Sequence, residues 1–303
     1  MGNTFQRCTA RAALVVSFAA LLYSPSVGLA GPITLGLAQS FAVLGHETVT
    51  NNHSDPNPQT KIYGNLGVTP GTAVTGFPPG IVSGGAIHTG LDGVAVAALA
   101  AAGAAYGTLI TGPLPYDYNY TGIALGTLGT PGYASLSPGI YHFDTTAQLL
   151  GKLTLDFGST PGANFIFQIG TSLTTGSASS VEVIGGDPLS GVYWQVGSQA
   201  NLGPDTTFAG NILAGTSVVL DPRAEILCGR AFALTGQVTL IDNLITNNCI
   251  AEDFGSGRSD FGSYGFSGGG SDTQGIPEPG TLTLLSVGLG AGFLLLRKFR
   301  SIR

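Results

Sequence analysis

Acidic and histidine side chains are the residues of this sequence that could support catalysis or bind a metal. A glycosidase needs two carboxyl groups that converge on one bond, and a polysaccharide lyase needs an acidic metal site with a base. The acids nearest to one another are Asp205, Asp221, Glu225 and Asp242, and the repeat described below does not stack them. The histidines, His46, His53, His88 and His142, lack the spacing of zinc ligands. Because a Gly-x-Ser-x-Gly elbow and a P-loop are also missing from the sequence, we expect no enzyme activity, metal or cofactor.

Hydroxyl and amide side chains recur at two-residue spacing in the second half of the chain. Four triplets share a polar–apolar–polar or hydroxyl–apolar–apolar pattern: Ser172-Leu173-Thr174, Gln199-Ala200-Asn201, Ser217-Val218-Val219 and Gln237-Val238-Thr239. Alternate residues of a strand point to opposite sides of the sheet. We therefore expect the central residues to point inward and their neighbours to form one flat, polar and mostly uncharged face.

The triplets belong to a longer repeat that must position this face. Each follows an apolar segment that ends in a small turn residue, at Gly170, Gly197, Gly215 and Thr235, with separations of 27, 18 and 20 residues. Further strands are expected at 181–184 and 224–227. Three short strands in each roughly 20-residue unit are typical of a β-solenoid, in which every coil stacks on the next.

Composition limits the possible partners of this solenoid. The 303 residues include 48 glycines and only 9% charged residues. Residues 31–276 hold five cations and sixteen acids, a net charge of about −11. Nucleic-acid binding requires clustered Lys and Arg, so the composition of residues 31–276 excludes a nucleic-acid-binding protein. The low charge and high apolar content of these residues also exclude disorder over most of their length.

An alanine-rich segment without proline lies between Leu91 and Ile110. Alanine has the highest helix propensity, so we predict one helix near residues 92–109, ended by Pro113 and Pro115. The segment is apolar nearly all round. We therefore expect it to be buried against the side of the solenoid.

The first 30 residues have the pattern of a secretory signal. Arg7 and Arg11 precede an apolar run at 12–23, and small residues at Gly28 and Ala30 indicate cleavage after Ala30. The alternative, an N-terminal membrane anchor, is disfavoured because the apolar run is shorter than the roughly 18–20 residues of a span.

The C-terminal segment, residues 276–303, has the pattern of a second targeting signal. Pro277, Glu278 and Pro279 precede an apolar stretch at 281–296 and a basic tail with Arg297 and Lys298. This order resembles the PEP-CTERM sorting signal of Gram-negative bacteria, which implies processing by an exosortase-type enzyme and an exopolysaccharide-rich envelope. The alternative is a plain transmembrane anchor with the basic tail in the cytoplasm. Residues 251–275, rich in Gly and Ser, are expected to be a flexible linker.

Cysteine use is consistent with export. Cys8 would leave with the signal, which leaves Cys228 and Cys249 in the mature chain. They are 21 residues apart, close to one coil, and neighbouring coils are about 4.8 Å apart. A disulfide between them is therefore compatible with the repeat.

The order of motifs between about residues 33 and 247 resembles the microbial ice-binding protein family. The resemblance rests on F41AVLG45, G64NLGVTPG71, V74TGFPPG80, S137PGIY141, L153TLD156, F165IFQIG170, V192YWQVG197 and G210NILA214. It implies a three-faced, discontinuous β-solenoid of residues 31–250, with the helix packed alongside and inserted between early and late coils. It also implies adsorption to ice through a flat outward face, with inhibition of ice growth or recrystallisation.

The resemblance identifies candidate ice-binding residues on and beside the second strand of each coil. The candidates are Ser172, Thr174, Ser177, Ser179, Ser180, Asn201, Thr206, Thr207, Ser217 and Thr239. The sequence departs from the family at the turn after that strand, where Pro204, Pro222 and Glu225 interrupt a column of small and hydroxyl residues. An alternative function is a structural or adhesive surface protein associated with exopolysaccharide.

Overall fold

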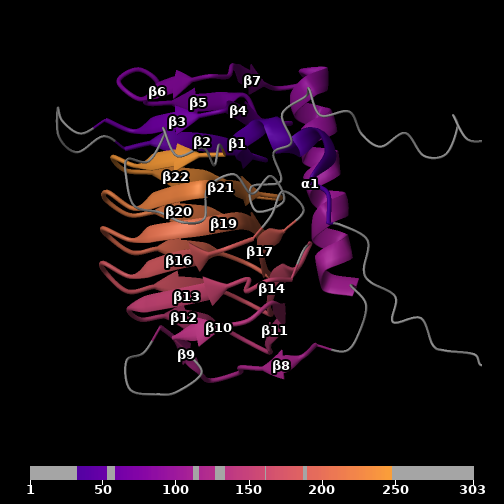
Figure 1. Ribbon diagram of the computed structural model, residues 1–303. Coiled ribbons are helices and arrows are strands. Elements are labelled where there is room, and N and C mark those ends of the chain that lie inside the picture. Colours follow the sequence, from indigo (N-terminus) through magenta and orange to yellow (C-terminus); the bar gives the residue numbers. More distant parts are fainter. Residues whose placement is uncertain are drawn as a thin grey trace, which may run out of the picture.

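The computed structural model describes residues 33–52, 59–111, 116–126, 134–160, 162–186 and 190–247. They form a β-solenoid of stacked coils with one long helix along its side (Figure 1). All the strand pairs are parallel, and each complete coil contributes to three faces, which we name A, B and C. The expected mainly β, three-faced solenoid with a flanking helix is confirmed.

Face B is an eight-stranded sheet made of one short strand from each coil. Its strands, in spatial order, are β5 (Ala73–Thr75), β2 (Thr48–Asn51), β22 (Val238–Leu240), β20 (Val218–Leu220), β18 (Ala200–Leu202), β15 (Leu173–Thr175), β12 (Ala147–Leu149) and β9 (Ala124–Leu125).

Faces A and C belong to one continuous sheet, because β19 (Thr207–Ala214) and β21 (Glu225–Ala233) run across both. Face A also contains β7 (Ile87–Thr89), β4 (Asn65–Val68), β1 (Phe41–Gly45), β17 (Gly191–Val196), β14 (Asn164–Ile169), β11 (Gly139–Phe143) and β8 (Tyr118–Asn119). Face C also contains β6 (Ile81–Ser83), β3 (Lys61–Tyr63), β23 (Leu244–Thr246), β16 (Ser180–Ile184), β13 (Lys152–Asp156) and β10 (Ser135–Leu136). The bend in β19 needs glycine, since Gly210 has a φ of 100° and an added Cβ would lie 2.6 Å from Val192.

The coils do not stack in sequence order. The last coil pairs with the first on all three faces: β21 with β1, β22 with β2 and β23 with β3. The register joins Ala231 to Val43 and Val238 to Val49. The N-terminal coils therefore continue the C-terminal stack, as expected for a discontinuous solenoid. Helix α1 follows β7 in the chain and runs along the side of the stack toward its opposite end, where β8 lies (Figure 1).

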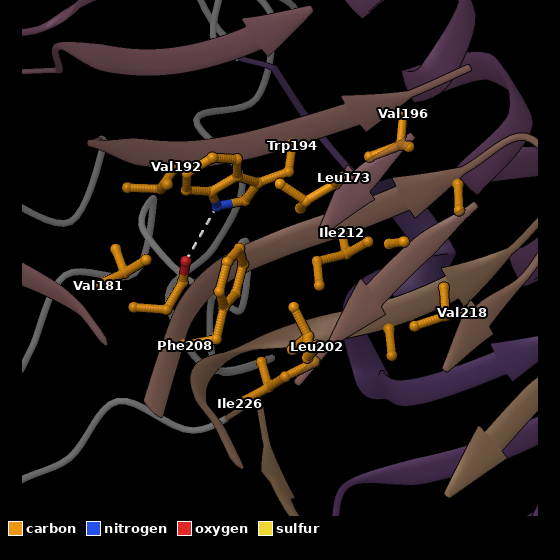
Figure 2. Close-up of a cluster of buried hydrophobic side chains, with 14 of the residues drawn as sticks. Leu173, Val181, Val192, Trp194, Val196, Leu202, Phe208, Ile212, Val218 and Ile226 are labelled. Carbon is orange, nitrogen blue, oxygen red and sulfur yellow. Dashed lines mark hydrogen bonds between the residues drawn. The ribbon is translucent and has the colours of Figure 1, made fainter. Parts of the chain in front are cut away.

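The interior is filled by the inward residues of all three faces. Leu173, Ala200, Val218 and Val238 are fully buried, as predicted from their alternation. Aromatic rings stack along the axis: Phe167 lies 3.7 Å from Trp194 with nearly parallel rings, and Trp194 lies 4.9 Å from Phe208. The Trp194 indole donates to the carbonyl of Ala209 at 3.0 Å, so this large side chain is both packed and hydrogen-bonded (Figure 2).

Helix α1 (Gly93–Thr111) agrees with the predicted 92–109 segment and packs on face A, as expected. Gln168 on β14 donates to the Leu109 carbonyl at 2.7 Å, and Tyr106 donates to the Val196 carbonyl at 3.3 Å. Only the side of the helix that faces the solenoid is buried, because Val94 and Val96 are exposed on the outer side. The segment Gly93–Ile110 is long and apolar enough to cross a membrane by composition, but one side of it is part of the core.

The short 3-10 helix η1 (Gly36–Ser40) also packs against face A. Arg230 on β21 is fully buried beneath it and donates to the Gln39 carbonyl and to Asn211 Oδ1. Burial lowers the pKa of this guanidinium to about 9. The N-terminal segment is thus attached to the last coil by a buried polar contact.

The predicted signal (1–30), linker (251–275) and sorting segment (276–303) lie outside the described residues, so these boundaries stay predictions.

Candidate functional site

Face B carries two columns of outward side chains, one at or just before the start of its short strands and one two residues further along the chain. The column nearer the strand ends contains, in spatial order, Ala124, Gln148, Thr174, Asn201, Val219, Thr239, Thr50 and Thr75. The column at the strand starts contains Thr146, Ser172, Gln199, Ser217, Gln237, Thr48 and Ala73. None of these fifteen side chains is charged.

The backbone fixes the spacing of this surface. Neighbouring strands are about 4.7–4.9 Å apart, and outward residues on one strand are separated by about 6.6–7 Å. Thr side chains are β-branched and therefore restricted in χ1, which limits the positions of their hydroxyls. Face B is a regular array of hydroxyl and amide groups that has alanine at its two ends, Ala124 and Ala73, and one aliphatic interruption, Val219, in the middle of its longer column.

Five of the sequence-predicted candidates meet on face B. They are Ser172, Thr174, Asn201, Ser217 and Thr239, which are all partly exposed and all outward. The structure thus brings together the residues that the period-two alternation had singled out.

Two other candidates, Ser179 and Thr206, point into the protein and are wrong as surface residues. They are 1% and 0% exposed. Each follows a residue with positive φ, Ala178 at 56° and Asp205 at 59°, in the turn from face B to face C. Because this residue adopts a left-handed conformation, the chain changes direction and the next side chain points inward. There it can form hydrogen bonds with backbone N–H and C=O groups of the turns. Ser179 donates to the Leu149 carbonyl at 3.0 Å and accepts from the Gly151 N–H at 3.2 Å.

The inward position of Ser179 predicts a stability effect. Ser179→Ala leaves the Gly151 N–H and the Leu149 carbonyl without this partner, which we expect to lower the free energy of unfolding by about 1–3 kcal/mol. Ser177→Ala is the matched control, because Ser177 is exposed in the same turn and should change stability by less than ~0.5 kcal/mol. Urea unfolding monitored by circular dichroism measures both, and equal effects would contradict the inward role.

Ser180 and Thr207 are outward but belong to face C, which corrects their assignment to the edge of the candidate surface. They pair with each other and lie in one column with Lys152 and Glu225. Ser177 lies in the exposed turn between the two faces.

The sequence reasoning missed the N-terminal part of face B. Thr48, Thr50 and Thr75 continue its columns because β2 stacks on β22 and β5 stacks on β2. Thr48-Val49-Thr50 has the same polar–apolar–polar pattern as the later triplets, and so does Thr146-Ala147-Gln148. That pattern could have identified both, but their place in the stack depends on the discontinuity.

The other two faces offer no comparable array. On face A, Leu44, Leu213 and Phe232 are fully buried beneath α1 and η1. Face C carries charge, including an ion pair between Lys152 and Glu182.

Asp205, one of the acids considered as catalytic candidates, forms an ion pair. Asp205 pairs with Arg223 on the neighbouring coil, at 2.7 Å from Oδ1 to Nε and 2.9 Å from Oδ2 to Nη2. This hydrogen-bonded contact with the Arg223 guanidinium lowers the pKa of the Asp205 carboxyl. Within the described ranges, no group of three or more His, Cys, Asp or Glu residues could hold a metal ion.

Cys228 is buried on β21 and forms a disulfide. Its predicted partner, Cys249, lies outside the described residues, so the pairing stays a prediction.

Comparisons with known proteins agree with this fold. Residues 43–246 match the family model described as Ice-binding-like. An ice-binding protein of Nostoc sp. (strain HG1) is 44% identical over 218 residues, covering 72% of this chain and 75% of that protein. One of Flammulina populicola is 28% identical over 240 residues, covering 72% and 90%. The crystal structure of an ice-binding protein from an Antarctic biological consortium superposes with a TM-score of 0.61 at 34% identity, covering 71% of this chain and 90% of that one.

Proposed function

The chain belongs to the ice-binding-like family, and we propose that it adsorbs to ice through face B and thereby inhibits ice growth or recrystallisation. We choose face B because its two columns of outward side chains are uncharged. No enzymatic step is part of this function.

The physical reason lies in how such a face holds water. Small hydroxyl and amide groups at fixed spacing can hold surface water in a repeating arrangement that matches a crystal better than mobile hydration does. Charged groups bind water strongly and without this periodicity. Face B has no charge in its two columns, whereas face C carries the Lys152–Glu182 pair and much of face A lies beneath α1 and η1. We therefore propose face B as the adsorbing surface.

Ice adsorption is tested directly on the purified protein. Fluorescently labelled protein should coat a growing ice surface and remain there after washing. Micromolar protein should also inhibit recrystallisation in frozen sucrose. Protein that is folded by circular dichroism but fails in both assays would overturn the proposal and favour a purely structural role at the cell surface.

The aliphatic interruption in the longer column gives a gain-of-function test. Val219 lies between Asn201 and Thr239, and threonine has nearly the same shape with a hydroxyl in place of one methyl. Val219→Thr should therefore complete the row of polar groups and lower the concentration needed for recrystallisation inhibition by a few-fold. An unchanged or higher concentration would show that the hydroxyl row is not what ice contacts.

We further propose export to the cell envelope or the medium. The signal ending at Ala30 and the Pro277, Glu278 and Pro279 motif support it, with an exosortase-type enzyme as processing partner and exopolysaccharide as the surrounding matrix. Intact mass of the protein recovered from its source cells and medium gives both termini. A full-length mass would contradict this processing.

A further inference from the structure

The terminal coil of the solenoid carries a sequence motif that the ice-binding surface does not use. The segment Asp117-Tyr118-Asn119-Tyr120-Thr121 contains Asn-x-Thr, the acceptor pattern for N-linked glycans. An acidic residue, Asp117, stands two positions before the asparagine, as in the extended acceptor of bacterial oligosaccharyltransferases. We propose that Asn119 is a site of N-glycosylation by a transferase of that class, acting on the exported chain.

The three motif residues are presented on the surface. Asn119 is an exposed residue of β8, and Asp117 and Thr121 are exposed on either side of that strand. The Asn119 Oδ1 accepts from the Thr121 N–H at 2.9 Å, which brings the acceptor amide and the threonine together. This contact uses only the oxygen of the Asn119 amide.

The local structure suits an enzyme that must take the segment into its own active site. Strand β8 has only two residues, and within the described chain it pairs with β11 alone. Besides that pairing, the segment is joined to the next coil by the Ile140 N–H to Asp117 Oδ2 and Asp144 N–H to Thr121 Oγ1 hydrogen bonds, and Tyr118 stacks on Tyr141 at 5.0 Å. These contacts all lie on one side of β8, with the next coil, so local opening of this end of the stack leaves the coils behind it folded.

The reaction needs no redox partner. The Asn119 Nδ2 forms a bond to the anomeric carbon of a glycan carried on a polyprenyl pyrophosphate. The bond between that carbon and the pyrophosphate oxygen breaks, and the pyrophosphate leaves with the electron pair. The amide nitrogen loses one proton.

The position of Asn119 is compatible with ice binding. Asn119 pairs with His142, which points outward on face A, so a glycan would extend from the end of that face and not from face B. There it would lie beside the exposed ring of Tyr116, which stacks on His142, and beside the outer edge of β8. Exposed strand edges invite pairing with another chain, and a bulky hydrophilic group at this end would oppose it.

Mass spectrometry of the full chain, expressed with its own leader in bacteria that carry a bacterial oligosaccharyltransferase and a lipid-linked heptasaccharide, tests the proposal. We expect one glycan, on the peptide that contains Asn119, and none in Asn119→Gln or Thr121→Val. Asp117→Asn should reduce occupancy at least tenfold. The motif Asn52-His53-Ser54 is the internal control, because Thr50 stands at the acidic position, and it should stay unmodified.

Two results would overturn the proposal: an unmodified Asn119 in exported chain from cells that glycosylate a known acceptor, or equal modification of Asn52. The mass of the processed N-terminus separates failed export from failed glycosylation. Ice adsorption of Asn119→Gln is measured in parallel, so the site and the ice surface are judged independently.

Discussion

Thr239→Tyr abolishes most of the ice activity if face B is the adsorbing surface. Thr239 lies within the longer outward column, between Val219 and Thr50. A tyrosine there raises a ring above neighbours that are valine and threonine, and a rigid crystal cannot deform around it. We expect the concentration for recrystallisation inhibition to rise by on the order of tenfold, equivalent to ~1.4 kcal/mol of adsorption free energy. Labelled protein should correspondingly leave the ice surface on washing.

The matched control is Thr207→Tyr. Thr207 is also a partly exposed, outward strand residue, but it lies on face C beside Ser180 and Glu225. The two variants add the same ring to the same residue type and should have similar stability. If Thr207→Tyr loses activity and Thr239→Tyr keeps it, adsorption occurs through face C.

The strand positions of the solenoid could be predicted from sequence because one rule governs all of them. A polar–apolar–polar triplet has one side to bury, and the alternation correctly placed Leu173 inside and Thr174 outside. The turns follow a different rule. At Ala178 and Asp205 the chain takes a left-handed conformation without glycine, which composition does not reveal. Ser179 and Thr206 were therefore misread as surface residues.

The helix and the N-terminal coils show two further limits of sequence reasoning. Helix α1 has no charged residue, so nothing in its pattern distinguishes the side that packs from the side with Val96 that stays exposed. The pairing of Thr50 with Thr239 joins residues 189 positions apart through a jump in coil order. No local spacing encodes that contact. The family resemblance implied the discontinuity in coil order, and the strand register in the structure identified the residues that it brings together.

Trp194→Ala should cause the largest loss of stability. The indole is fully buried, stacks on Phe167 at 3.7 Å and donates to the Ala209 carbonyl. Truncation leaves a cavity that the rigid coils cannot close, at a cost of about 3–5 kcal/mol, and the unpaired carbonyl adds to it. Because each coil contacts only its neighbours, a defect in the middle of the stack weakens both halves. The midpoint of urea unfolding should fall markedly.

Trp194→Phe separates the two contributions to this loss. Phenylalanine keeps a ring against Phe167 but cannot donate to the Ala209 carbonyl, so its cost should lie near the ~1–3 kcal/mol of an unmade buried hydrogen bond. Val94→Ala, on the exposed side of α1, should change stability by less than ~0.5 kcal/mol. A Trp194→Ala variant as stable as Val94→Ala would mean that the aromatic stack does not hold the coils together. The solenoid would then depend on its backbone ladders and aliphatic residues alone.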